Sequence, residues 1–346
     1  MSLLRGSSSD FFGLDIGATA VRMAQLRNAG SQKALVKYAY VPLDSKLSMS
    51  DSKADMQKLA QAIKQLVDKS RINTKNVAVG IPSSKVFTTV ADVERLPASE
   101  LAKSIRYQAD SLIPTPLAES KLDWTLIGDS PADKTKQEIL LTSVPNKFVE
   151  ERLDMLEAVG LNVIAFEPDN LAMARALSVP DAAAQLLLDV GRRSTDLVIV
   201  LGSTPHLTRS IPTGVEAIVR AASQNMSVDN KQAEQFVFKF GLSKDKLEGQ
   251  VHQAISGTVD LLDGEIEKSI KFFQTRYVGS KIEKIIVTGG ASVIPEFPLY
   301  LANNFGLNVE IGNAWHNVAY SHDRENELLA ISNQFGVAVG LAERQG

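Results

Sequence analysis

The chain has 346 residues, with 37 basic and 40 acidic side chains, a net charge of −3 and no cysteine. This weak acidity argues against a general nucleic-acid surface, which needs clustered Lys and Arg, and the lack of cysteine excludes disulfides and thiolate metal sites. Hydrophobic residues make up 44% of the chain, which is enough for buried cores in one to three domains.

No stretch reaches the ~20 apolar residues that a membrane-spanning helix needs. The first ten residues lack the apolar core of a signal peptide, and residues 341–346 do not form an amphipathic anchor. We therefore expect a soluble, cytoplasmic chain without direct membrane insertion.

The first part of the chain predicts a sheet covered by a helix. Its predicted elements are a strand-turn-strand hairpin at 11–22, strands at 34–41 and 76–82, and a helix at 56–67. From about residue 83 to 160 the pattern changes to that of a small α+β subdomain. Its predicted elements are strands at 86–93, 122–127 and 137–144, a helix at 99–112 capped by Ser99, and a helix at 147–159.

The rest of the chain starts with a strand at 162–166 and a helix at 171–177, and then repeats the opening pattern. A second hairpin is predicted at 186–201. The further predicted elements are strands at 204–211, 284–288 and 308–311, and helices at 215–225, 230–240, 250–277, 297–305 and 325–344.

Both hairpins contain Asp-x-Gly after an apolar run, first at Asp15-Ile16-Gly17 and again at Asp189-Val190-Gly191. This near-repeat predicts two halves with the same core, whose hairpins face each other across a cleft and grip a triphosphate from both sides. One such motif alone is more simply a β-turn, because Asp and Gly are common in turns. Its occurrence twice favours ligand binding.

The first turn has the donors that an anion needs. Gly17 lets the backbone approach a ligand, and the turn through Ala18 points N–H groups at an anion, with the Thr19 hydroxyl as a further donor. Asp15 would hold a hydrated Mg²⁺ through its waters. The same argument places Asp189, Gly191, Ser194 and Thr195 on the opposite wall, with Asp189 as the second residue that holds Mg²⁺ through water.

Three other features each have a functional and a structural explanation; for the last of them, the small residues near the end of the chain, these are a hinge between the halves and simple tight packing. Thr288-Gly289-Gly290-Ala291 is either a surface for adenine or ribose or a tight turn. Lys231 and Glu234 share one helix face and either reach the ribose and the adenine edge or form a solvated ion pair. Gly336, Ala338 and Gly340 permit close contact with a neighbouring helix. The chain has no Walker A or Gly-x-Gly-x-x-Gly pattern and no histidine pair at metal-ligand spacing.

Two Asp-x-Gly motifs followed by a strand that ends in Gly-Gly resemble the actin and heat-shock chaperone ATPase superfamily. The resemblance implies an α/β chain with the actin-like ATPase fold, in which two ribonuclease H-like halves surround a nucleotide cleft. Residues 167–177 and the last helix resemble its two connecting helices. Arg22, a basic residue after the first loop, is part of the narrower resemblance to one family of this superfamily that the segment 13–22 carries.

Within the superfamily the chain is similar to the PilM family of type IV pilus assembly proteins over about residues 10–344. The segments that carry this resemblance are 13–22, 110–114, 122–124, 144–147, 156–161, 169–177 and 287–291. It implies a first half at 10–183 with the α+β subdomain inserted at about 83–160. It also implies a second half at 184–324 with a helical insertion at about 214–280, and a C-terminal helix at 325–344 that packs back on the first half.

The resemblance further implies a chain that binds ATP (or ADP) with Mg²⁺ and docks the N-terminal peptide of PilN, an inner-membrane protein. The peptide groove is expected between the first subdomain and the insert, near Leu101, Ile105 and Leu112. Through this partner the chain would lie at the cytoplasmic face of the inner membrane. Pilus motor ATPases and self-association are further candidates, and no nucleic-acid partner is expected.

One departure bears on hydrolysis. Related proteins carry small residues where this chain has Arg192-Arg193, and these arginines either add charge-assisted contacts to phosphate or block its approach. Asp196 fits the pattern of the FtsA family better. We therefore expect weak or absent ATP hydrolysis, with Glu167 and Asn170 as candidates to position the attacking water.

Three other functions stay open from the sequence: a sugar kinase-like phosphotransferase of the same fold, an FtsA-like division protein and a scaffold that no longer binds nucleotide. A pilus, a competence system and a secretion system are all compatible with the leading function.

Overall fold

The computed structural model describes residues 10–30, 32–48, 50, 52–180 and 183–345. The first nine residues, where no signal peptide is expected, lie outside the described residues. Contacts between Cα atoms divide the chain into two compact units. Unit 1 contains residues 1–85, 146–177 and 313–346, and unit 2 contains residues 86–145 and 178–312.

Unit 1 is built on a six-stranded sheet with the strand order β14-β3-β2-β1-β4-β8. Its strands are β1 Phe12–Ile16, β2 Ala20–Ala29, β3 Gln32–Pro42, β4 Asn76–Ile81, β8 Asn162–Pro168 and β14 Val318–Ala319. β1, β2 and β3 form an antiparallel meander, whereas β1, β4 and β8 run parallel. The first predicted hairpin and the three strands predicted after it in this unit are confirmed.

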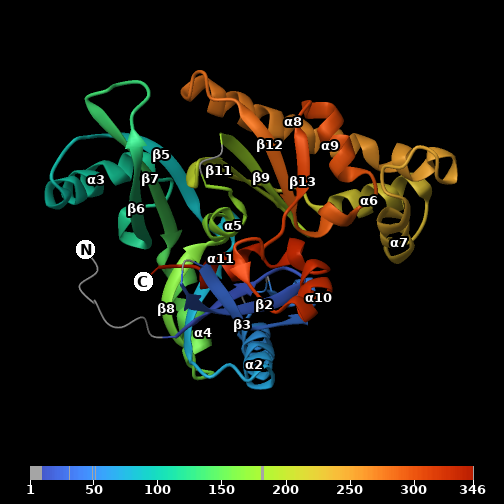
Figure 1. Cartoon of the computed structure of the whole chain (residues 1–346), viewed down its shortest axis with the longest axis horizontal. Helices are drawn as coiled ribbons and strands as arrows, with labels where there is room; N and C mark the ends of the chain where they lie inside the picture. Colours follow the sequence, from blue (N-terminus) through green and yellow to red (C-terminus); the bar gives the residue numbers. More distant parts are fainter. Residues whose placement is uncertain (1–9, 31, 49, 51, 181–182, 346) are drawn as a thin grey trace. The chain divides into compact units, whose positions relative to one another are not determined.

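Helices cover both faces of this sheet (Figure 1). On one face α2 (Lys53–Ser70) and α4 (Asn146–Glu157) share a core with Phe12 and Leu14 of β1. Gly13 points to the other face, because side chains alternate along a strand. There α11 (Gly336–Ala342) lies so close that a Cβ on Gly13 would clash with its backbone.

The close contact predicted for the small residues near the end of the chain is confirmed. α11 packs along α5 (Asp169–Leu177), and a Cβ on Gly340 would overlap the carbonyl of Ala172. Glycine at this position therefore sets the distance between the two helices.

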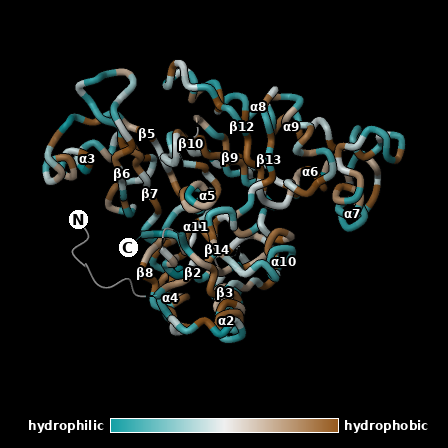
Figure 2. Tube along the Cα trace, viewed as in Figure 1, coloured by the Kyte–Doolittle hydropathy of each residue, from teal (hydrophilic) through white to brown (hydrophobic). Residues whose placement is uncertain are grey.

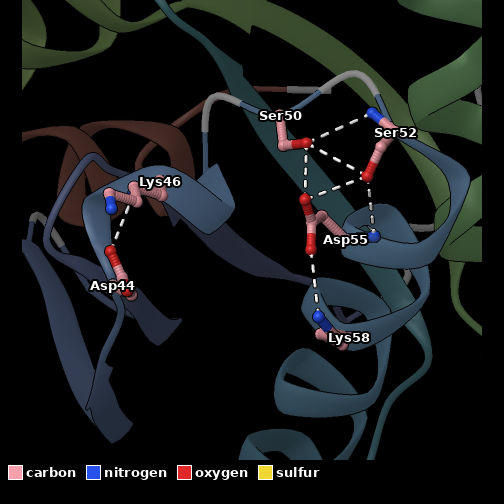
Figure 3. Close-up of polar contacts among 6 residues, drawn as sticks. All are labelled: Asp44, Lys46, Ser50, Ser52, Asp55 and Lys58. Atoms are coloured by element: carbon pink, nitrogen blue, oxygen red, sulfur yellow. Dashed lines mark hydrogen bonds and ion pairs between the residues drawn. The ribbon is translucent and has the colours of Figure 1, made fainter.

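The start of α2 is fixed by a network of side-chain hydrogen bonds (Figure 3). Ser52 is the N-cap, and its hydroxyl accepts from the N–H of Asp55 at 3.2 Å. The Asp55 carboxylate accepts from the hydroxyls of Ser50 and Ser52 at 2.7 and 2.9 Å and from Lys58 at 3.1 Å. These donors favour the ionised form and lower the pKa of Asp55 to about 2.

The larger sheet of unit 2 has five strands in the order β11-β10-β9-β12-β13. Its strands are β9 Ala184–Val190, β10 Thr195–Leu201, β11 Thr204–Ile211, β12 Ile282–Thr288 and β13 Asn308–Ile311. β9, β10 and β11 form an antiparallel meander, whereas β9, β12 and β13 run parallel. This repeats the order and directions of β3-β2-β1-β4-β8, so the predicted internal repeat is confirmed in the topology.

Four helices share one hydrophobic core with this sheet, and they confirm the helices predicted here. They are α6 Val215–Met226, α7 Asn230–Phe240, α8 Gln250–Arg276 and α9 Phe297–Phe305. Figure 2 shows the hydrophobic residues concentrated along the strands, whereas the loop that joins β6 and β7 is largely hydrophilic. None of the helices in the described part of the chain is both long and apolar enough to cross a bilayer.

In the region of the predicted α+β subdomain, a three-stranded sheet with the order β5-β7-β6 shares a core with α3. The helix predicted there at 147–159 is α4, which packs in the core of unit 1 instead. The elements are β5 Phe87–Glu94, α3 Ala98–Leu112, β6 Ser120–Asp129 and β7 Lys136–Pro145. This segment interrupts unit 1 along the chain, and its contacts group it with unit 2. Ser99 is not the N-cap that we predicted, because α3 begins one residue earlier, after Pro97, whose fixed φ suits a helix start.

The single long helix predicted at 325–344 is wrong. The segment forms α10 (Glu325–Leu329), a 3₁₀ turn and then α11. The helix breaks where the Phe335 ring packs against Trp315 and Tyr38, with ring centroids 5.2 and 5.6 Å apart. Trp315 also donates its indole N–H to the Leu328 carbonyl at 2.9 Å. Burial of these three rings outweighs a continuous helix.

Candidate functional site

In unit 1 the turn between β1 and β2 brings Asp15, Gly17 and Arg22 together. The Gly17 N–H donates to the Ala20 carbonyl at 3.0 Å and closes the turn. Asp15 and Arg22 lie opposite each other on the two strands, and Arg22 Nη1 is 3.4 Å from Asp15 Oδ2. Burial raises the pKa of Asp15, and the guanidinium opposes this rise. The first acid is therefore a buried member of an ion pair.

Ala18 and Thr19 form the tip of this turn. Ser48 donates its hydroxyl to the Ala18 carbonyl at 3.3 Å, and Leu43 donates its N–H to the Thr19 carbonyl at 2.8 Å. Within the described residues, no hydrogen bond takes up the N–H groups of Ala18 and Thr19, and Thr19 is exposed. The carbonyls are thus held from one side while the donors stay available, as an anion-binding turn requires.

Glu167 and Asn170 lie where β8 passes into α5, and both side chains are buried. Arg175 donates to both carboxylate oxygens of Glu167, and Arg344 adds a third contact at 3.3 Å. Asn170 Oδ1 is buried without a hydrogen-bond partner among the described residues. The same holds for other buried oxygens, such as Gln25 Oε1 and Ser178 Oγ, so the role of Asn170 in positioning water stays a prediction.

The turn between β9 and β10 in unit 2 closes in the same way. The Gly191 N–H donates to the Ser194 carbonyl at 2.9 Å, and Thr195 donates its hydroxyl to the Thr213 carbonyl at 2.7 Å. The residue opposite Asp189 is Asp196. The second turn therefore has the same backbone as the first, but Asp196 stands where the first hairpin has Arg22.

The second turn also caps α6, which the sequence did not indicate. The carbonyls of Gly191 and Arg192 accept from the N–H groups of Val215 and Glu216 at 3.0 and 2.8 Å. A Cβ on Gly214 would lie 2.6 Å from the Gly191 carbonyl oxygen. A glycine directly before a predicted helix was the only sequence signal of this close approach.

Both arginines of the second turn reach helices of the same unit. Arg192 forms an ion pair with Glu234 of α7, and Arg193 Nε lies 3.5 Å from Glu216 of α6. Arg192 and Glu234, predicted separately as ligand contacts, are therefore brought together. Lys231 lies one turn before Glu234 and is exposed.

The end of β12 lies beside the end of β9, with Thr288 opposite Asp189. Gly289 has φ +79°, and a Cβ there would clash with the Asp189 carboxylate and lie 2.7 Å from the Val190 carbonyl. Only glycine fits both the conformation and the space. Gly290 is exposed and Ala291 is buried, so the predicted adenosine segment shares one sheet edge with Asp189.

The residues predicted for the partner groove face the core of the insert. Leu101 and Ile105 are buried with Ile139 and Leu141, and Leu112 packs against this cluster at its border. Leu101 and Ile105 can therefore support a groove only from the core below it. Of the three residues, Leu112 is the one that is partly accessible to a partner. Their contact with a partner stays a prediction.

A metal ion bound here would take most of its ligands from water and phosphate, not from side chains. In the part of the chain that the structure describes, no three His, Asp or Glu side chains gather as a ligand set. A hydrated Mg²⁺ keeps several waters and needs only one or two carboxylates, so the residues present suit that type of binding.

The comparisons with known proteins agree with this architecture. A family model described as "Type IV pilus assembly protein PilM" matches residues 13–346. A solved structure described as a PilM-PilN type IV pilus biogenesis complex is 26% identical with a TM-score of 0.82, and the match covers 97% of this chain and 98% of that chain.

Two more distant structures show the fold alone. The ethanolamine utilization protein EutJ from Carboxydothermus hydrogenoformans is 13% identical with a TM-score of 0.59, over 98% of this chain and 91% of that chain. MreB5 of Spiroplasma citri bound to AMPPNP is 12% identical with a TM-score of 0.53, over 97% and 95%. The predicted actin-like ATPase fold is confirmed.

Proposed function

This chain belongs to the family of the type IV pilus assembly protein PilM, and on this basis we propose that it is an ATP-binding scaffold that docks a PilN-like inner-membrane protein through its N-terminal peptide. The observation that carries the proposal is the match to the PilM-PilN complex over nearly the whole length of both chains. Docking would hold the chain at the cytoplasmic face of the inner membrane. Pilus motor ATPases and a second copy of the chain are further candidate partners.

ATP or ADP, with Mg²⁺, is the ligand that we propose for the two turns. The N–H groups of Ala18 and Thr19 support phosphate binding in unit 1. In unit 2 the support comes from the close approach of Gly289 to Asp189. Asp15 and Asp189 would each contact the hydrated Mg²⁺ through water.

We propose weak or absent hydrolysis for two structural reasons. Glu167 is held by two guanidinium groups, so it is not free to activate water. Arg192 is paired with Glu234, and phosphate would have to compete for it. Asn170, with its orphaned acceptor, stays as the candidate to position water.

Calorimetric titration of ATP, with and without Mg²⁺, tests the nucleotide site. We expect Mg²⁺-dependent binding that Asp15→Ala and Asp189→Ala each weaken at least tenfold. Asp68→Ala, an exposed acid on α2 paired with Lys64, is the matched control and should bind like the wild type. Absence of binding in a nucleotide-stripped wild type would remove ATP from the proposal and leave a nucleotide-free scaffold.

A synthetic peptide with the first cytoplasmic residues of the PilN-like partner tests the docking. Fluorescence anisotropy should show saturable binding that Leu112→Ala weakens about fivefold, because truncation removes apolar contact area. Leu126→Ala, an exposed leucine on β6, should leave the affinity unchanged. If the peptide does not bind with or without ATP, the scaffold proposal fails even where ATP binding succeeds.

A further inference from the structure

Unit 2 contains a pocket of about 450 Å³ that none of the roles assigned above uses. Its walls are formed by β5 and β7 of the insert, by β11 of the five-stranded sheet and by the C-terminal half of α8. The volume lies in the range of pockets that hold small molecules. No residue of the predicted nucleotide site or partner groove lines it.

The pocket lies between the edges of two sheets. β5 pairs only with β7, and β11 pairs only with β10. Among the described residues, no backbone hydrogen bond connects β5 to β11. The two edges are in contact without backbone hydrogen bonds between their described residues, and the hydroxyls of Thr88, Thr89 and Thr208 add polar groups to the walls.

At one end of the pocket, acidic side chains balance the positive charge of the lining arginine. Arg276 donates to the buried Glu138 at 2.7 Å and to Asp92 at 2.9 Å, so two carboxylates face one guanidinium. Tyr277 donates its hydroxyl to Glu138 at 3.0 Å and completes the network. This end therefore offers no excess positive charge.

The other end carries an excess positive charge. Arg209 and Lys268 share a single carboxylate, that of Glu265, and Lys268 Nζ lies 2.6 Å from it. Of the described residues, both cations line the pocket, whereas neither Glu265 nor any other acid does. Ser269, which accepts from Arg209 at 3.1 Å, adds a hydroxyl beside them. An anionic group is therefore favoured at this end.

Apolar side chains form the body of the pocket. Leu207 and Phe273 contribute to its walls, and Phe272 stands beside them with 66% of its surface exposed. An exposed phenylalanine at the mouth of a pocket is a feature of binding sites, since an occupant would cover it.

We propose that this pocket binds a small amphipathic anion, with an aromatic or branched apolar body against Leu207, Phe272 and Phe273 and a carboxylate or phosphate at Arg209 and Lys268. The site joins the insert to the second sheet, so an occupant would stabilise unit 2 as a whole. It is separate from the nucleotide and from the partner peptide.

The probe for this proposal is 2-naphthoate, a flat aromatic carboxylate, and its neutral control is 2-naphthamide. Saturation-transfer NMR on the full chain, without nucleotide or partner, should give a dissociation constant of roughly 1 mM for naphthoate. The amide should bind at least about threefold more weakly. A third arm with 2-naphthyl phosphate distinguishes a preference for phosphate from one for carboxylate.

Two variants with matched controls on the same helix locate the binding. Lys268→Gln should raise the dissociation constant of naphthoate about threefold, whereas Lys271→Gln, an exposed lysine paired with Glu267 outside the pocket, should not change it. Phe272→Ala should raise it about fivefold, whereas Leu261→Ala, also exposed on α8, should not.

Equal binding of naphthoate and naphthamide would overturn the proposal, and so would equal binding by Lys268→Gln and Lys271→Gln. An absence of saturable binding, or selective capture of an acidic peptide in place of the naphthalene probes, would overturn it as well. Because no nucleotide and no partner peptide enters this test, its failure is distinguishable from a failure of the proposed function.

Discussion

The turn after β1 and the turn after β9 have the same backbone and different electrostatics. Each is closed by one hydrogen bond from its glycine, at Gly17 and at Gly191. Opposite the acid, however, the first hairpin has Arg22 and the second has Asp196. The second hairpin carries its positive charges at the tip of the turn, where they pair with helices. A repeated topology therefore does not imply repeated chemistry.

The largest expected effect is the difference in stability loss between alanine substitutions at two glycines, Gly80 near the end of β4 and Gly289 directly after β12. Gly289→Ala should lower the free energy of unfolding by about 3 kcal/mol, because the new Cβ meets the Val190 carbonyl and the backbone is left-handed there. Gly80→Ala should cost about 1 kcal/mol, because its Cβ meets only side-chain atoms of Asp169 and Val337. Urea unfolding of both variants measures the difference, and equal costs would contradict it.

The next prediction concerns Arg22, the basic residue of the first hairpin. Arg22→Ala should lower the free energy of unfolding by about 2 kcal/mol at pH 7, because buried Asp15 loses its partner. Burial raises the pKa of Asp15. Below pH 3.8 the carboxyl is protonated, so the cost of a buried charge without a partner disappears. This cost grows as the pH rises through the raised pKa. Unfolding at pH 4 and pH 7 tests the sign, and a larger loss in acid would refute it.

A matched change in the second hairpin sharpens this contrast. Asp196→Asn should change the free energy of unfolding by no more than about 0.5 kcal/mol, because the residue opposite it is another acid and no cross-strand ion pair with Asp189 is lost. The same urea experiment at pH 7 measures the change. A loss as large as that of Arg22→Ala would mean that the two hairpins are electrostatically alike.

The arginine at the tip of the second turn has a smaller expected effect. A double-mutant cycle of Arg192→Ala and Glu234→Ala should give a coupling energy of about 0.5 kcal/mol, since both side chains are partly exposed. With saturating ATP the coupling should decrease if Arg192 turns to phosphate. An unchanged coupling would show that Arg192 stays on α7 and takes no part in binding.

The smallest expected effect lies at the start of α2 (Figure 3). Asp55 should titrate near pH 2, so its contribution to stability is present above pH 3.8 and is lost as the pH falls towards 2. Carbon-13 NMR of the Asp55 carboxyl measures this value. Ser52→Ala should move the midpoint upwards, and an unchanged midpoint would exclude the cap as its cause.

The sequence predicted the repeat because its signal is local. Apolar runs end in Asp-x-Gly at both hairpins, and the helices have their apolar residues at regular spacing, so 230–240 and 297–305 were predicted with the observed bounds. The family resemblance then supplied the topology that connects these elements.

What the sequence missed depends on contacts between distant residues. Phe335 ends a predicted helix because it meets Trp315 and Tyr38, and neither ring is close to it in sequence. Arg192 reaches Glu234 across many intervening residues, so a choice between phosphate and an internal partner needed the structure. The capping of α6 by the second turn likewise depends on backbone atoms, which leave almost no trace in residue type.

The close approach of α11 to β1 also has a consequence for synthesis of the chain. Gly13 meets Ala338, so the first strand of unit 1 finds its helix only after the residues between them have been synthesised. Unit 2 contains only residues 86–145 and 178–312 and can form its core earlier. During that interval one face of β1 has no helix on it, and this is the stage at which the nascent chain depends most on protection from aggregation.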